Sequence, residues 1–171
     1  RNLGVFTTRD IPLNRLFSQF QGKLNGYTKG RDRSFHFGTQ EHKLVGMISH
    51  LGPQLGIADG IALANKITKN QKSTIVFTGD GGASEGDFHE SLNVAAVWDL
   101  PVIFAVENNC WGLSTPSVEQ FRCKQSPNLQ QNLTPHSYSF NLPKNYSFSS
   151  YIINLELLLY SISDYLSKDK P

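Results

Sequence analysis

Two short apolar runs constrain the fold of this chain more than any other feature of its sequence. They cover Ser73–Thr78 and Pro101–Val106, and each is followed within two residues by a glycine-rich or asparagine motif, which is typical of buried strands. The stretch Glu85–Val97 between them has the apolar spacing of a helix. A strand, a helix and a second strand in this order predict two parallel strands joined by a right-handed crossover. We therefore expect an α/β fold, with a parallel sheet and flanking helices.

Two further segments have helical spacing. Ile11–Gln21 carries Pro12 in its first turn and is followed by Gly22, which suits the start and the end of a helix. Gln54–Lys66 repeats apolar residues at helical intervals. The basic, glycine-punctuated stretch Gly22–Gly38 between them is expected to be a loop.

The distribution of glycine divides the chain into two unlike parts. All 14 glycines lie at or before Gly112, and the sequence after Lys124 becomes rich in Ser, Asn and Tyr. An α/β domain needs glycine at many of its turns. We therefore predict a partial α/β domain over residues 1–124 and leave residues 125–171 as an unassigned tail, for which an aberrant gene end is one explanation.

The composition excludes several classes of protein. A formal net charge of +2 is too small to indicate a nucleic acid or a membrane surface as partner. No apolar run reaches the ~20 residues that a membrane-spanning helix needs. The two cysteines, Cys110 and Cys123, have no paired spacing, which excludes a disulfide framework and a zinc ribbon and fits a reducing compartment.

Two polar motifs stand at the ends of the predicted strands. Gly79–Gly82 reads Gly-Asp-Gly-Gly after the first strand, and Asn108–Asn109 follows the second, with 26 residues between Gly81 and Asn108. That is the length of one helix, one strand and their turns. Because ligands of parallel α/β sheets bind beyond the carboxyl ends of the strands, we expect the two motifs to lie side by side at a binding site.

The residue types of the two motifs suit a cation and a phosphate. Asp80 offers a carboxylate and Asn109 an amide oxygen, and Mg²⁺ takes such oxygen ligands together with phosphate oxygens. Gly81 and Gly82 let backbone N–H groups approach a phosphate. Each motif alone has a plain structural alternative, a tight turn or a loop, but their spacing favours one diphosphate–metal site. The glycine motifs of P-loop and dinucleotide-binding proteins are absent.

The longer text around both motifs resembles the alpha subunit of the thiamine diphosphate-dependent 2-oxo acid dehydrogenases, nearest to the branched-chain 2-oxoisovalerate type. The segments that carry the resemblance are Gly79–Glu90, Glu107–Pro116, Gly30–Gly38 and Ser49–Gln54. The resemblance covers Arg1 to about Lys124. It implies a thiamine diphosphate-binding fold that is incomplete in this chain, and we therefore expect a fragment.

The resemblance also implies roles for individual residues. The implied metal ligands are Asp80, Asn109 and the main-chain oxygen of Trp111; the implied cofactor contacts are Arg1, Gly81 and Gly82 at the diphosphate and Ser49 and Leu51 at the aminopyrimidine end. Cys110 and Trp111 stand where family members often have Gly-Tyr. The activating glutamate of the family comes from the partner chain, so no catalytic residue is assigned here.

The function implied by the resemblance is the oxidative decarboxylation of a small 2-oxo acid, with transfer of the acyl group to the lipoyl group of a partner acyltransferase. The cofactors are thiamine diphosphate and Mg²⁺, and a beta subunit or beta domain completes the site. The preferred compartment is the cytoplasm, with the mitochondrial matrix as second choice. Two alternatives stay open: another thiamine enzyme of the transketolase type, against which Ser84–Asp87 argues, and an inactive truncated remnant.

Overall fold

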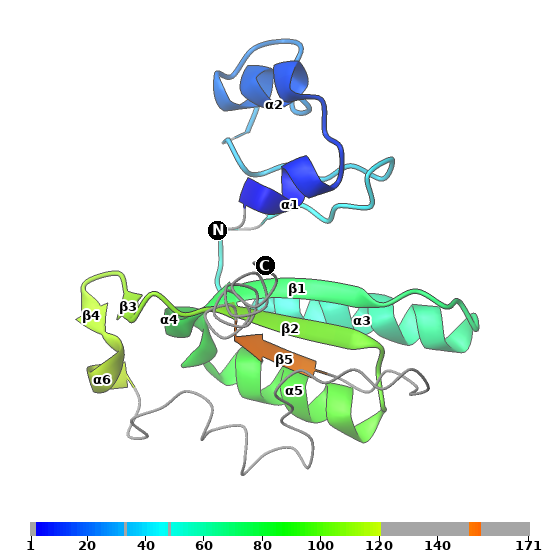
Figure 1. Ribbon diagram of the computed structural model, residues 1–171, viewed down its shortest axis with the longest axis vertical. Helices are drawn as coiled ribbons and strands as arrows, with labels where there is room; N and C mark the ends of the chain where they lie inside the picture. Colours follow the sequence, from blue (N-terminus) through cyan, green and yellow to red (C-terminus); the bar gives the residue numbers. More distant parts are fainter. Residues whose placement is uncertain (1–2, 33, 48, 121–150, 155–171) are drawn as a thin grey trace, which may run out of the picture. The chain divides into compact units, whose positions relative to one another are not determined.

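The computed structural model describes residues 3–32, 34–47, 49–120 and 151–154. The chain divides into two compact units, Arg1–His50 and Leu51–Pro171. Figure 1 shows the helices of the first unit in blue and the sheet of the second in green and orange. No helix in these ranges is both long and apolar enough to cross a membrane.

The first unit contains two short helices over an aromatic core. Helices α1 (Leu3–Thr8) and α2 (Leu13–Phe20) bring together the buried side chains Phe6, Ile11, Leu16 and Phe37, against which Phe20, Tyr27, Phe35 and Leu44 pack. The rings of Tyr27 and Phe37 stack with centroids 4.6 Å apart, a geometry that adds to the stabilisation from burial. The core therefore gathers residues from both helices and from the loop after them.

The predicted helix Ile11–Gln21 is confirmed as α2, and the residues expected at its two ends are found there. Pro12 is the N-cap, and Gly22 follows the C-cap with a φ of +65°, the left-handed conformation that glycine adopts without strain. The predicted loop Gly22–Gly38 contains only turns and irregular backbone in its described residues. Helix α1 was not predicted, because its six residues, LGVFTT, are too few to show a helical period.

The second unit is built on a parallel sheet. Strands β1 (Thr74–Gly79) and β2 (Val102–Glu107) pair in parallel from Thr74 with Val102 to Gly79 with Glu107. Strand β5 (Tyr151–Asn154) pairs in parallel with the other edge of β2, so the strand order is β1-β2-β5. The predicted α/β class with a parallel sheet is confirmed.

Two helices pack with this sheet. α3 (Pro53–Ile67) and α5 (Gly86–Val97) lie beside each other, and α3 contacts β1 and β2. One buried cluster joins them to the strands: Leu55, Ala58, Ala62, Val76, Ala83, Phe88, Leu92, Ala95, Leu100, Val102, Phe104 and Val106. Phe104 is fully buried. Both helices were predicted from their apolar spacing, and each boundary agrees within one residue.

The smaller elements follow the two strand ends. After β1 comes the one-turn helix α4 (Asp80–Ala83). After β2 come the paired strands β3 (Trp111–Gly112) and β4 (Thr115–Pro116) and then α6 (Ser117–Gln120). Gly79 of the Gly-Asp-Gly-Gly motif ends β1, and Asp80–Gly82 are helical, where a tight turn was one of the alternatives.

Of the predicted tail, 125–171, only β5 lies among the described residues. Its four residues extend the sheet of the second unit as a third strand. This segment therefore belongs to the same sheet as β1 and β2. The rest of the tail lies outside the described residues, and the predicted division at residue 124 stays a prediction.

Candidate functional site

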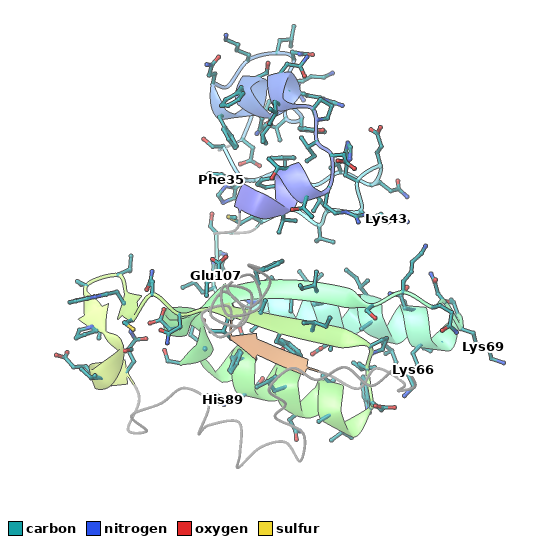
Figure 2. All side chains as sticks on the ribbon, in the orientation of Figure 1. Phe35, Lys43, Lys66, Lys69, His89 and Glu107 are labelled. Carbon is teal, nitrogen blue, oxygen red and sulfur yellow. The ribbon has the colours of Figure 1, made fainter. Side chains whose placement is uncertain are left out.

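The register of the sheet places the two motifs at the same edge. Gly79 is the last residue of β1 and pairs with Glu107, the last residue of β2, which Figure 2 labels. Asp80 is the next residue after Gly79, and Asn108 is the next after Glu107. Because the strands are parallel, the segments that carry Asp80 and Asn108 leave the sheet side by side, as the spacing predicts.

Asp80 is an acidic residue in an unusually enclosed position. It begins α4 and is only 2% exposed. Its Oδ2 atom is buried and has no hydrogen-bond partner among the described residues. An enclosed carboxylate oxygen without a donor is costly, and native structures normally match such a group with a donor or a cation. The position is suited to holding a cation.

The asparagine motif fixes the shape of the loop after β2. Asn108 Oδ1 accepts a hydrogen bond from Cys110 N at 3.0 Å, and Asn109 Oδ1 accepts one from Trp111 N at 2.9 Å. These turns, in which a side chain bonds its own backbone two residues on, hold Cys110 at a φ of +65°. An amide oxygen can accept two interactions, so Asn109 keeps an acceptor site for a metal. The replacement of the family's Gly-Tyr by Cys110–Trp111 is accommodated without glycine.

The glycine segment and this loop touch each other. A Cβ atom added to Gly81 would lie 2.9 Å from Gly112 Cα, in β3. A Cβ atom added to Gly82 would lie 2.5 Å from Thr78 Oγ1. Both distances are shorter than real contacts of this kind, so neither position leaves room for a side chain unless its neighbour shifts. The two glycines allow α4 to pack directly against β3 and the end of β1.

The structure says less about the other three predicted cofactor contacts. Ser49 lies in the first unit, where its Oγ is 3.1 Å from His36 Nε2. Leu51 opens the second unit and is 40% exposed. Arg1 lies outside the described residues. The structure therefore brings together Asp80, Gly81 and Gly82 with the loop of Asn109 and Trp111, and the roles of Ser49, Leu51 and Arg1 stay predictions.

The donor set at Asp80 fits one class of cation. Within the described ranges, no group of three or more His, Cys, Asp or Glu side chains is arranged to hold a metal ion. A cation at Asp80 would depend on neutral oxygens and on phosphate for its other ligands. This set suits Mg²⁺ bound with a diphosphate and does not suit Zn²⁺, which takes nitrogen and sulfur ligands in closed sites.

A second buried acid lies on α3. Asp59 is 5% exposed, and burial raises its pKa from 3.8 to about 6, although a side-chain hydrogen bond with Ser91 acts in the opposite direction. Asp59 stands one turn after the buried Leu55 and next to the buried Ala58. The signal for it in the sequence is an acidic residue on an otherwise apolar helix face.

Asp59 is expected to make the stability of the chain fall as the pH rises. The folded state holds the Asp59 proton up to about pH 6, and the unfolded state holds it only up to about pH 3.8. Asp59 therefore does not lower the free energy of unfolding below about pH 4, and it lowers it by the full amount above pH 6. We expect Asp59→Asn to match the native chain near pH 4 and to exceed it above pH 6 by on the order of 2 kcal/mol. Urea unfolding at several pH values measures the difference, and a pH-independent difference would contradict the assignment.

The chain is similar to known dehydrogenase subunits. Residues 1–130 match the family described as "Dehydrogenase E1 component". The 2-oxoisovalerate dehydrogenase subunit alpha 1 of Arabidopsis thaliana and the corresponding alpha subunit of Dictyostelium discoideum are each 40% identical over 122 residues, which is 71% of this chain and 26% and 28% of those proteins. The pyruvate dehydrogenase E1 component subunit alpha-1 of Arabidopsis thaliana is 37% identical over 123 residues, 72% of this chain and 31% of that protein.

These comparisons bear on three predictions. The relatives are alpha subunits of 2-oxo acid dehydrogenases, with the branched-chain type at least as similar as the pyruvate type, as the resemblance implies. The chain spans between a quarter and a third of their length. All three are named as mitochondrial, so they give no support to the preference for the cytoplasm.

Proposed function

The chain belongs to the dehydrogenase E1 component family, and on that premise we propose that it forms the part of a thiamine diphosphate site that binds Mg²⁺ and the diphosphate. The observation that carries the proposal is the enclosed Asp80 carboxylate, whose Oδ2 has no donor among the described residues and which stands beside the asparagine loop at the end of two parallel strands. A bound cation would supply the missing partner.

The proposed ligands come from the two strand ends. Asp80, the Asn109 side chain and the main-chain oxygen of Trp111 hold Mg²⁺, and backbone N–H groups at Gly81 and Gly82 meet the diphosphate. Arg1 binds the diphosphate as well, and Ser49 and Leu51 contact the aminopyrimidine ring. In this proposal the chain's own residues position and neutralise the cofactor, and none of them moves a proton.

We propose that the chain takes part in the reaction for which its relatives are named, that of a 2-oxo acid dehydrogenase. When bound, thiamine diphosphate supplies the chemistry that releases CO₂ from a 2-oxo acid and passes the acyl group to a lipoyl arm. A beta chain completes the site, and a lipoyl-bearing acyltransferase accepts the product. The higher identities to the branched-chain type favour a branched-chain 2-oxo acid as substrate, and the mitochondrial relatives favour the matrix.

Two competing functions make different predictions. A transketolase-like enzyme has no support from the relatives, which are 2-oxo acid dehydrogenase subunits. An inactive remnant is the second rival. A remnant with an incomplete core should unfold without a cooperative transition, whereas the proposed function requires one. Circular dichroism during heating separates the two.

Selectivity for the diphosphate tests the proposal directly. We expect the chain, mixed with the beta chain encoded by the same genome and Mg²⁺, to bind thiamine diphosphate about tenfold more tightly than thiamine monophosphate. The reason is that the proposed Mg²⁺ ligands and the backbone N–H groups at Gly81 and Gly82 all act at the diphosphate end of the cofactor. Isothermal titration of the mixture, with the beta chain alone as control, measures the ratio. Equal affinities, or no binding beyond that of the beta chain, would rule the proposal out.

A further inference from the structure

A groove of about 380 Å³ runs between α3 and α5. On the α3 side it is lined by Gly52, Gly56 and Gly60, and a Cβ atom added to Gly56 or Gly60 would meet nothing within 4 Å. None of its lining residues is a proposed ligand of Mg²⁺ or of the cofactor. At the far end of the two helices, Lys66 Nζ donates to the Trp98 and Asp99 carbonyl oxygens at 2.6 and 3.0 Å, and Figure 2 labels Lys66 there.

The groove contains a buried carboxylate with unused bonding capacity. Asp59 lines it and is 5% exposed. Ser91, which also lines the groove, bonds the Asp59 side chain, but the Oδ1 atom of Asp59 has no hydrogen-bond partner among the described residues. A carboxylate in this position is costly unless a donor reaches it. We therefore expect a hydrogen-bond donor to bind Asp59 Oδ1 in the groove, and a cationic donor forms the strongest bond to a carboxylate.

All the charged side chains that line the groove are acidic. The charged residues that line it are Asp59, Asp87 and Glu90, and no Lys, Arg or His is among the lining residues. A cationic group therefore meets a negative potential before it reaches Asp59. A neutral donor would satisfy Oδ1 but would gain nothing from the two rim carboxylates.

The two helices that form the groove also expose apolar side chains. Ile57 and Ile61 on α3 are 43% and 37% exposed, Val97 at the end of α5 is 69% exposed, and Trp98, a lining residue, is 51% exposed. Of these side chains, Trp98 lines the groove itself, and an exposed tryptophan at a groove is typical of a surface that another protein covers. A small dissolved cation would leave Trp98 in water, whereas a protein surface carrying a cationic side chain would bury it.

We propose that the α3–α5 groove receives an arginine or lysine side chain of the beta chain, with its cationic head at Asp59 Oδ1 and its alkyl stem over Gly56 and Gly60. Glycine leaves the space for such a stem, which packs well on apolar surface. A partner without a cation would bury Asp59 unpaired, and an unpaired buried charge strongly opposes association. This inference rests on the proposed assembly with a beta chain but is independent of the metal ligands.

Asp59→Asn is the variant that tests this pairing, because it is expected to shift folding and association in opposite directions. It should melt at or above the temperature of the native chain at pH 7.5, since it removes a buried charge. It should also bind the beta chain about tenfold more weakly, since the cation loses its carboxylate. Glu90→Gln is the matched control: it removes an exposed acid of the same groove and should change the affinity by less than about threefold.

Analytical ultracentrifugation and isothermal titration of the full chain with the beta chain encoded by the same genome measure the association. Asp59→Asn binding within twofold of the native affinity would overturn the inference while leaving the proposed function intact. Failure of the native chain to bind the beta chain, or self-association through the groove instead, would overturn both the inference and the proposed assembly.

Discussion

Asp80→Ala is expected to weaken the binding of thiamine diphosphate in the presence of Mg²⁺ by roughly 100-fold. Asp80 provides the one carboxylate of the proposed ligand set, so its loss leaves only neutral oxygens to hold a divalent cation beside the diphosphate. The fold should survive, because the variant removes a buried carboxylate whose Oδ2 has no donor among the described residues. Titration of thiamine diphosphate into the chain mixed with its beta chain measures the cofactor affinity. A thermal melt of each variant measures whether the fold survives.

Asp99→Asn is the matched control for Asp80→Ala. Asp99 is an exposed acid between α5 and β2, and it does not line the α3–α5 groove. It is outside the proposed ligand set, so its replacement should change the cofactor affinity by less than about twofold. If Asp80→Ala bound the cofactor as tightly as the native protein, Asp80 would not be a magnesium ligand and the site assignment would fail.

The sheet and its two main helices could be predicted because their signals are local and periodic. The apolar runs of β1 and β2 and the helical spacing of α3 and α5 come from residues close together in the sequence. The parallel pairing followed from their order, and the register of Gly79 with Glu107 is the consequence that makes the two motifs neighbours. The prediction of this edge of the sheet therefore needed no long-range information beyond the crossover rule.

The features that were not predicted depend on contacts between distant residues. The burial of Asp80 is decided by how α4 packs against β1 and β3, and a sequence pattern does not carry that packing. The same holds for β5, which pairs with β2 across a long stretch of chain. Glycine content was the ground for the predicted division at residue 124, and it reports turns rather than strand pairing. For Asp59 the one local signal was an acid on the apolar face of α3.

Gly81→Ala is expected to weaken thiamine diphosphate binding about 30-fold while leaving the core of the second unit folded. The added methyl group would lie 2.9 Å from Gly112 Cα, a backbone atom that can move only if β3 moves with it. The displacement would carry Trp111 and the asparagine loop away from Asp80. Gly81 does not have a positive φ, so the backbone itself tolerates alanine, and in a helix alanine is favoured over glycine by up to about 1 kcal/mol.

Gly86→Ala isolates this steric effect, because it makes the same change at the start of α5. There the added methyl group would have Glu90 Oε1 at 3.7 Å as its nearest neighbour, an ordinary contact, so cofactor affinity should stay within about twofold of the native value. Trp111 fluorescence, measured in a Trp98→Phe background, should shift in Gly81→Ala and not in Gly86→Ala, because only the former displaces β3. Native fluorescence and native affinity in Gly81→Ala would mean that the loop yields without cost, and the close approach of α4 to β3 would then have no part in forming the site.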